Sequence, residues 1–232
     1  MSDSTADPKT LALAAAGCLA GGVASELRVP LRELREGLAV VVEILDQHLN
    51  GPEGPIPHPW EETKALRERV AQAYLSGRRV ARLNSDLADA INSYGLSPEL
   101  VDVNKLVEVA TNLTRHRISA STELFIDFGQ VPAVRLVPGE VVLLLARLLT
   151  IAADSAHDVQ GAAVSVKTRT ENISGVPEIA IYIADSGSGL PDEVNTASVL
   201  GKDVAKSVGG SFEGTSEVGS GSVFELRIPV EA

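Results

Sequence analysis

The sequence predicts an α+β protein: an N-terminal hairpin of two long helices, followed by a C-terminal α/β sandwich. The hairpin is indicated by apolar residues that repeat every seven positions over 11–49 and again over 61–94. The sandwich is indicated by helix-spaced segments that alternate, from about residue 102, with segments in which every second residue is apolar. We expect the hairpin domain to cover 8–96 and the sandwich domain to cover 101–232.

The composition narrows the class of protein. Hydrophobic residues make up 44% and charged residues 22% of the 232 residues, which is typical of a folded globular protein. A net charge of −11 argues against nucleic acid as a partner, because such binding needs cations to neutralise phosphates. Cys18 is the single cysteine, so no intramolecular disulfide forms, and the four histidines do not cluster with metal-ligand spacing.

The stretch 11–24 is almost wholly apolar, and it could be taken for a signal peptide or a membrane span. It is shorter than the ~20 residues that cross a bilayer. It also follows Asp3 and Asp7, whereas a signal peptide begins with basic residues. We therefore expect a buried or dimer-facing helix in a cytoplasmic protein without a membrane partner.

The two long helices each carry two apolar rows. A segment rich in Pro and Gly, 51–59, separates the helices, because proline cannot continue a helix. In the first helix one row is Leu31, Leu38 and Leu45, and the other is Leu27, Leu34, Val41 and His48. In the second helix one row is Leu66, Ala73, Val80, Leu87 and Tyr94, and Val70 and Ile91 lie beside it. Two helices cannot bury all these rows alone, so we predict a homodimeric four-helix bundle.

The second half contains three helical and four strand patterns. Alternation predicts strands over 124–128, 164–166, 179–183 and 224–228, and helical spacing predicts helices over 106–113, 141–156 and 197–208. The helix over 141–156 is apolar on nearly every side, so it should be buried. Strands grouped with helices on one face give the sandwich.

A candidate ligand site follows the strand that ends at residue 184. Asp185 comes first, and Gly187 and Gly189 follow it at alternate positions. The carboxylate can accept a hydrogen bond from an exocyclic amine, and glycines let the backbone approach a flat ligand closely. The same residues also suit an ordinary strand-ending turn.

The order of these segments resembles the ATP-binding domain shared by histidine kinases, gyrase, Hsp90 and MutL, over roughly 102–230. In that resemblance Asp185 matches the adenine-binding acid, and Gly187 and Gly189 match the first glycine box. Ser222 stands where the family usually has a threonine near the adenine.

The first helix selects one branch of this family. The segment 25–31, Ser-Glu-Leu-Arg-Val-Pro-Leu, resembles the phosphoacceptor box of histidine kinases, and 82–87 resembles the partner helix of their hairpin. The resemblance implies a histidine kinase of a two-component system, with ATP and Mg²⁺ as cofactors, a homodimer, and a response regulator as partner.

The acceptor position departs from the family pattern. Ser25 stands where the family has its phosphoacceptor histidine, and a serine hydroxyl is a far weaker nucleophile than imidazole. Ser25 lies off the apolar rows, so it should be exposed. Glu26, the acid of the box, and His157, a candidate replacement acceptor near the phosphate end, are the residues assigned to catalysis. The remaining histidines are expected to be structural or incidental.

The phosphate end departs as well. Ile151 replaces the asparagine that binds Mg²⁺ in the family, so Asp154 is the nearest carboxylate for a weakly held ion. The second glycine box is almost absent between Pro191 and Ser198. Lys202 is a candidate for binding a phosphate group, and the alternative is that it is a solvated lysine without that role.

Three functions remain open on these residues. They are a divergent soluble histidine kinase, a pseudokinase or phosphotransfer scaffold that docks a response regulator, and a kinase of the anti-sigma type. Asp185 and its glycines favour retained nucleotide binding, while Ser25 and Ile151 favour the scaffold. The long hairpin counts against the anti-sigma type, and the divergent kinase is our expectation.

Overall fold

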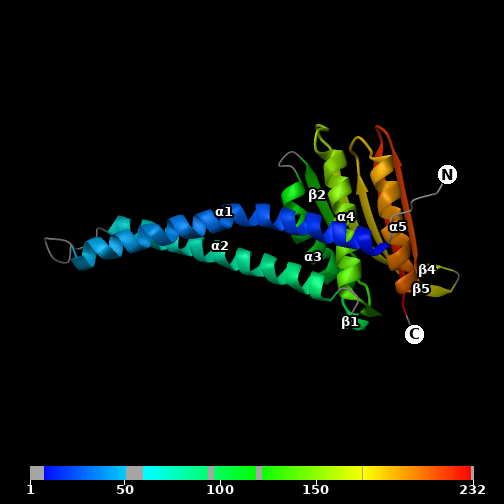
Figure 1. Ribbon diagram of the computed structural model, residues 1–232, viewed down its shortest axis with the longest axis horizontal. Coiled ribbons are helices and arrows are strands. Elements are labelled where there is room, and N and C mark those ends of the chain that lie inside the picture. The colour runs from blue at the N-terminus through cyan, green and yellow to red at the C-terminus, as the bar shows by residue number, and fades with distance from the viewer. Residues whose placement is uncertain (1–7, 51–59, 94–96, 119–121, 174, 231–232) are drawn as a thin grey trace. The chain divides into compact units, whose positions relative to one another are not determined.

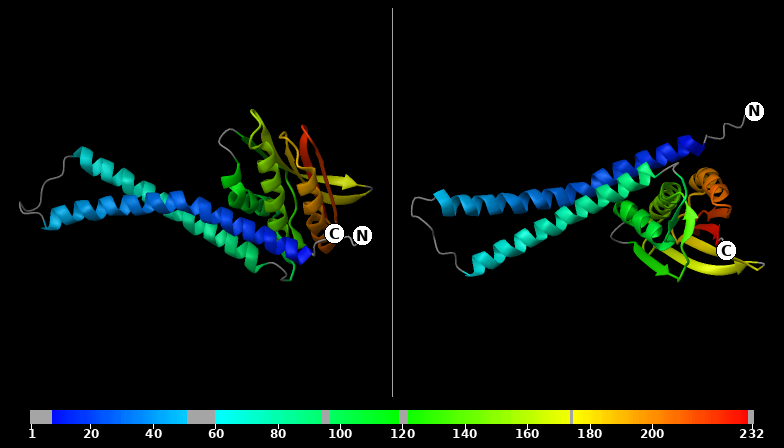
Figure 2. Two further views of the ribbon diagram at one scale, coloured as in Figure 1. Left: turned by 45° about the horizontal axis from the view of Figure 1, so that its top comes forward. Right: turned by 90° about the horizontal axis from the view of Figure 1, so that it is seen from below.

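The computed structural model describes residues 8–50, 60–93, 97–118, 122–173 and 175–230. The chain divides into two compact units. One unit is Val23–Ser85, and the other contains Asp86–Ala232 together with the start of the chain up to Gly22. The first unit contains most of helices α1 (Pro8–Asn50) and α2 (Trp60–Asn92), which run antiparallel beside each other (Figure 2).

The hairpin of α1 and α2 is packed closely through small residues. A Cβ added to Gly37 would lie 2.7 Å from the Cβ of Ala73, so only glycine allows this approach of the helices. One turn along, the Ser76 hydroxyl donates to the Glu33 carboxylate at 2.6 Å. Helix α1 continues through Pro30 without a break.

The apolar rows of the hairpin have different fates. One row of each helix faces the other helix. In these rows Ala73 of α2 is buried, and Leu34 and Val41 of α1 are half-buried. Leu31 and Leu38, from the other row of α1, are 46% and 53% exposed. The hairpin therefore leaves one apolar row of α1 uncovered.

The second unit is built on a five-stranded sheet with the order β2-β4-β5-β7-β6. Strand β2 runs parallel to β4, and the other neighbours are antiparallel. The strands are β2 (Glu123–Phe128), β4 (Ala163–Ile173), β5 (Val176–Asp185), β6 (Ser211–Glu217) and β7 (Gly221–Pro229). A small second sheet pairs β1 (Glu99–Val101) with β3 (Val134–Leu136).

Three helices cover one face of the large sheet (Figure 1). They are α3 (Val103–Thr114), which a 3₁₀ turn over Arg115–Arg117 extends, α4 (Pro138–Ala156) and α5 (Pro191–Ser207). Helix α4 is buried nearly throughout, because apolar residues occupy almost all of its faces. Alternate residues of β5, such as Ile181 and Ile183, form the buried side of that strand.

The structure confirms the predicted α+β class, with two differences in detail. Helix α5 begins at Pro191, six residues before the predicted start, because proline favours the first position of a helix. The prediction missed this start because the first turns of the helix are polar and show no apolar spacing. Strand β6 was not predicted, because Phe212 is its single large apolar residue. The short strands β1 and β3 were also missed.

Candidate functional site

Asp185 is the last residue of β5, and it is only 7% exposed. Its position follows from strand geometry, because alternate residues share a face and Asp185 continues the buried series of Ile181 and Ile183. The two neighbouring strands fix its register, with Val164 of β4 on one side and Ser222 of β7 on the other. The fold thus holds a carboxylate at the edge of the apolar core.

The two oxygens of Asp185 differ in their hydrogen bonds. Oδ1 accepts from the Ser155 hydroxyl at 2.6 Å and from the backbone N–H of Gly187 at 2.9 Å. Oδ2 is buried and has no hydrogen-bond partner among the residues that the structure describes. A buried carboxylate oxygen without a donor destabilises the protein, so a ligand that donates a hydrogen bond to this atom would be stabilising.

Ser155, near the end of α4, organises the loop that follows Asp185. Besides donating to Asp185, its Oγ accepts from the N–H of Gly189 at 2.9 Å, and its carbonyl accepts from the N–H of Ser188 at 2.9 Å. The sequence singled out the motif around Ser155 without giving that residue a role. A buried hydroxyl at the end of an otherwise apolar helix is the signal that could have found it.

The two glycines of the loop lie against other parts of the protein backbone. A Cβ on Gly187 would lie 2.1 Å from the carbonyl oxygen of Ser155. Gly189 has a φ of +73°, and a Cβ there would lie 2.2 Å from the carbonyl oxygen of Glu217. Both glycines are therefore required for packing the loop between α4 and the β6–β7 turn, and their contact with a nucleotide stays a prediction.

Ser222 lies beside Asp185, and its place near an adenine stays a prediction. The two residues are paired across β5 and β7, and Ser222 is buried. Its Oγ is 3.1 Å from the Oγ of Ser216, which also accepts from the N–H of Leu190. The structure thus brings Asp185 and Ser222 together at one end of the sheet, next to Ser155.

The predicted metal position does not form a cation site. Ile151 is 1% exposed and offers no ligand atom. Asp154 points a carboxylate oxygen to Arg117, 3.5 Å away. Across the described part of the chain, no group of three or more His, Cys, Asp or Glu side chains could hold a metal ion. Mg²⁺ therefore does not fit the residues that surround its expected position.

The start of α5 is acidic. Asp192 and Glu193 lie in its first turn, directly after Pro191. Arg147 of α4 forms an ion pair with Glu193 and so connects the two helices. This contact was not predicted, because nothing in the sequence relates two residues 46 positions apart.

The other predicted residues are Lys202, His157, Ser25 and Glu26. Lys202 lines a hollow of about 510 Å³ between α5 and β6, and it stands 11 residues, roughly 16 Å, beyond the start of α5. The side chain of His157, just after α4, is 61% exposed and lies 4.0 Å from Asp158. Ser25 and Glu26 belong to α1, but their side chains are outside the described part of the structure.

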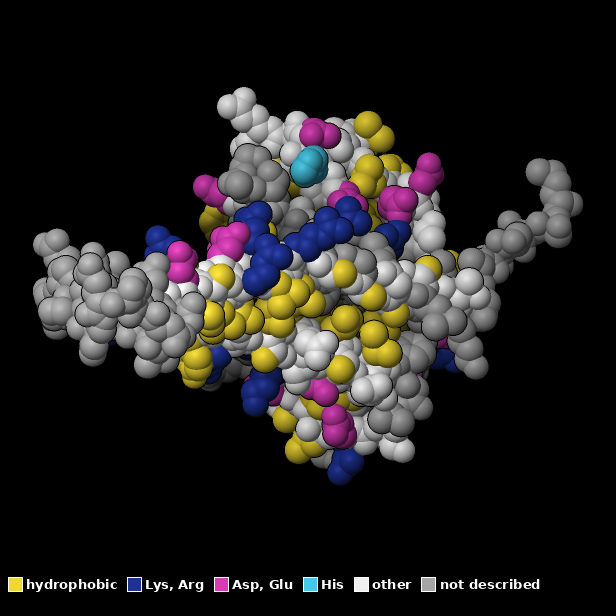
Figure 3. All heavy atoms as spheres, turned by 60° about the vertical axis from the view of Figure 1, so that its left-hand side comes forward, with side chains coloured by type: hydrophobic (Ala, Val, Ile, Leu, Met, Phe, Trp, Pro, Cys, Tyr) yellow, Lys and Arg dark blue, Asp and Glu magenta, His cyan; other side chains and the backbone are white. Residues whose placement is uncertain are grey.

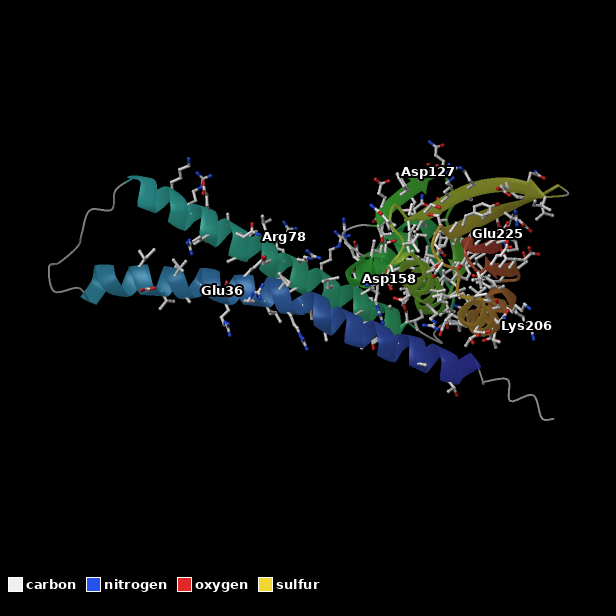
Figure 4. The ribbon with its side chains drawn as sticks, turned by 90° about the horizontal axis from the view of Figure 1, so that it is seen from above. Glu36, Arg78, Asp127, Asp158, Lys206 and Glu225 are labelled. Carbon is white, nitrogen blue, oxygen red and sulfur yellow. The ribbon has the colours of Figure 1, made fainter. Side chains whose placement is uncertain are left out.

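A charged cluster lies on the sheet face opposite the helices. Tyr182 donates to Glu171 at 2.9 Å, and Arg227 pairs with Glu171 at 2.9 Å and with Glu225. Glu225 is labelled in Figure 4. Burial, followed by the hydrogen bond to Glu171, raises the pKa of Tyr182 to about 12. The bonds from Tyr182 and Arg227 lower the pKa of Glu171. These interactions join three strands of the sheet.

The sequence is similar to a few known proteins. No family model matches it. Sensor histidine kinase ZraS of Salmonella typhimurium is 26% identical over 241 residues, which cover 95% of this chain and 47% of the relative. ZraS of Klebsiella oxytoca is also 26% identical, over 94% of this chain and 47% of the relative. The chain is thus similar to sensor histidine kinases, at low identity. It spans about half the length of the curated relatives that it matches.

Solved histidine kinases are similar in outline. The catalytic domain of histidine kinase ThkA is 13% identical, with a TM-score of 0.48 over 58% of this chain and 96% of that one. Acinetobacter baumannii histidine kinase AdeS is 18% identical, with a TM-score of 0.46 over 88% of this chain and 96% of that one. Among the described residues, no helix combines the length and the hydropathy needed to cross a membrane.

Proposed function

We propose that this chain is a two-component signalling protein of the histidine-kinase lineage, which binds ATP at Asp185 and acts on a response regulator. The observation that carries the proposal is the buried Oδ2 of Asp185, which has no partner in the described part of the chain. The exocyclic amine of adenine is a donor that would satisfy it. A buried acceptor left unpaired costs about 1–3 kcal/mol, so a ligand that supplies the donor gains that energy.

Ser222 and the loop of Gly187 and Gly189 complete the proposed adenine site. Ser222 lies on the strand next to Asp185, so it stands beside any ring bonded to that carboxylate. The loop is held to α4 through Ser155, which fixes the orientation of Asp185. Lys202 remains a proposed phosphate contact only for a ligand that extends along α5 to the hollow beside β6.

The hairpin supports a homodimer. Leu31 and Leu38 are exposed on α1, and Tyr74 and Leu75 are exposed on α2. On the face drawn in Figure 3, hydrophobic side chains lie beside Lys and Arg side chains. A hollow of about 620 Å³ on α1 is lined by Arg28, Leu31, Arg32, Leu34, Arg35 and Leu38. A second hairpin packed on these rows would bury them in a four-helix bundle.

The phosphoryl step divides the proposal into two functions. In the first, the chain is a kinase: ATP donates its terminal phosphoryl group to a histidine, and the group passes to an aspartate of a cytoplasmic response regulator. The family relation supports this function. His157 is the proposed acceptor, because its imidazole is exposed directly after α4, and Glu26 is the proposed acid of the hairpin box.

The second function is a pseudokinase that docks a response regulator without transferring phosphate. Two substitutions favour it: Ser25 at the acceptor position, and Ile151 at the position of the metal ligand. Neither side chain can perform the family's chemistry at its position. Both functions share the nucleotide at Asp185.

Incubation of the chain with γ-labelled ATP and Mg²⁺ distinguishes the kinase from the pseudokinase. Label that is labile in acid, stable in base and lost in His157→Ala establishes the kinase. Absence of label, with nucleotide binding retained in calorimetry, establishes the pseudokinase. Absence of binding as well removes the whole proposal. Asp185→Ala should abolish binding, whereas Asp203→Asn, a change of an exposed acid on α5, should leave it unaltered.

A further inference from the structure

The ion pair between Arg147 and Glu193 joins α4 to the start of α5, where we expect the phosphate end of the proposed site. Arg147 lies one helical turn before Ile151 on α4, and Glu193 lies in the first turn of α5. Because the loop after Asp185 leads directly into α5, this turn is the next part of the protein that a nucleotide bound at Asp185 would meet. The guanidinium of Arg147 is therefore occupied by a carboxylate of the protein itself.

The start of α5 is unsuited to hold phosphates. A helix N-terminus binds anions through free N–H groups and the positive end of its dipole. Here Pro191 has no N–H, and the N–H of Leu190 donates to the Ser216 hydroxyl at 2.9 Å, so two of the N–H groups that a helix start usually leaves free are missing. Asp192 and Glu193 place two carboxylates in the same turn, where they would repel a phosphate group.

Around Ile151, helix α4 offers no unpaired ligand for a divalent cation that could offset that repulsion. Ile151 replaces the metal ligand with a buried aliphatic side chain, and Asp154 is paired with Arg117. No cluster of metal-binding side chains exists elsewhere in the described part of the chain. A triphosphate would thus meet carboxylates without a divalent cation between them.

We infer that the site recognises the adenosine part of its ligand alone and holds it without a divalent cation. This inference rests on the proposed nucleotide site at Asp185 and favours the pseudokinase over the kinase. It names the ligand class of the site: adenine nucleosides and nucleotides, bound whatever their number of phosphates. The donor that Asp185 requires is on the adenine ring, and adenosine, AMP and ATP all carry it. Each added phosphate contributes nothing favourable, because the first turn of α5 is acidic.

Calorimetric titration of the full chain with adenosine, AMP and ATP, each in Mg²⁺ and in EDTA, tests the inference. We expect adenosine and AMP to bind at least as tightly as ATP, and EDTA to change none of the affinities. Tighter binding of ATP than of adenosine, lost in EDTA, would overturn the inference while leaving the proposed nucleotide site intact. No binding of any of the three would instead overturn the proposed function itself.

A charge variant gives an independent measurement. Glu193→Gln removes one carboxylate from the start of α5 and releases Arg147, so ATP should bind roughly two- to fivefold more tightly, as expected for one charge at a helix end. Its affinity for adenosine should not change. Asp203→Asn removes an acid from the same helix beyond its first turn and should alter neither affinity. Equal effects of the two variants on ATP would contradict the inference.

Discussion

The hydroxyl of Ser155 donates to Oδ1 of Asp185 at 2.6 Å and so joins the end of α4 to the end of β5. The same Oγ accepts from the N–H of Gly189. One side chain therefore links the buried helix, the carboxylate and the loop that follows it. The orientation of Asp185 depends on this bond, because its other partner is a single backbone N–H.

Ser155→Ala should destabilise the fold. The change removes a donor from Oδ1 of Asp185 and an acceptor from the N–H of Gly189, and buried groups left unpaired cost about 1–3 kcal/mol. Urea unfolding measures the loss. Ser220→Ala, at an exposed position, is the control and should stay within about 0.5 kcal/mol of the original chain. Equal stabilities of the two variants would show that the bond contributes nothing.

Gly187→Ala should destabilise the protein through collision rather than backbone strain. The added Cβ would meet the carbonyl oxygen of Ser155 at 2.1 Å, and backbone atoms of a buried helix cannot move aside, so we expect a loss of about 3 kcal/mol or more. Gly161→Ala separates the two causes. Gly161 has a φ of +74° and open space around it, so about 1–2 kcal/mol of backbone strain is its only cost. Thermal unfolding of both variants makes the comparison.

The sequence predicted the parts of the fold that depend on apolar periodicity. Helix α4 was predicted from the apolar run 141–156, and strand β5 was predicted from the alternation of apolar residues that leads to Asp185. Strand β6 was missed because hydrogen bonds to β7, rather than apolar side chains, define it.

Contacts between distant residues explain the limits at the site. The acid and the glycines after β5 were recognised from their spacing, but their neighbours were not. Gly187 is required by the backbone of Ser155, 32 positions earlier in the chain, and no local pattern reveals such a contact. The pair of Arg147 and Glu193 was missed for the same reason.

Alkaline pH should weaken the sheet through Tyr182. Its pKa is raised from 10.0 to about 12, so the fold favours the neutral phenol. The stability that this group contributes is complete below pH 10.0 and is lost as the pH rises through about 12. Tyr182→Phe should lose less stability than the original chain over that interval. Parallel decline of both proteins in thermal unfolding at each pH would contradict the assignment.

Glu171 should make the stability of the fold fall at acid pH, through the same cluster. Its pKa is lowered below 4.5 by bonds from Tyr182 and Arg227. Its contribution to stability is therefore present above pH 4.5 and is lost as the pH falls through the lowered pKa. Glu171→Gln should flatten this part of the stability curve, as followed by urea unfolding at several pH values. Glu213→Gln, an exposed acid of β6, should leave the curve unchanged.

The uncovered row of α1 should mediate dimerisation. Leu31→Asp combined with Leu38→Asp places carboxylates on that row, so the proposed four-helix bundle should dissociate into monomers. Light scattering after gel filtration gives the mass. Glu36→Lys changes an exposed charge of α1 in the same stretch (Figure 4), and this variant should remain a dimer. A monomeric original chain would remove the proposal.

Restoring the acceptor should not restore the kinase. Ser25→His supplies the imidazole that the phosphoacceptor box lacks, and a chain deficient in the acceptor alone would then incorporate label from γ-labelled ATP. The phosphate end remains without a metal ligand, because Ile151 is aliphatic and Asp154 pairs with Arg117. It also remains acidic at Asp192 and Glu193. For the pseudokinase, we therefore expect Ser25→His to stay unlabelled while its affinity for adenosine is unchanged. Labelling of this variant would show that the phosphates are held productively despite these residues, and that the loss of histidine alone separates the chain from its relatives.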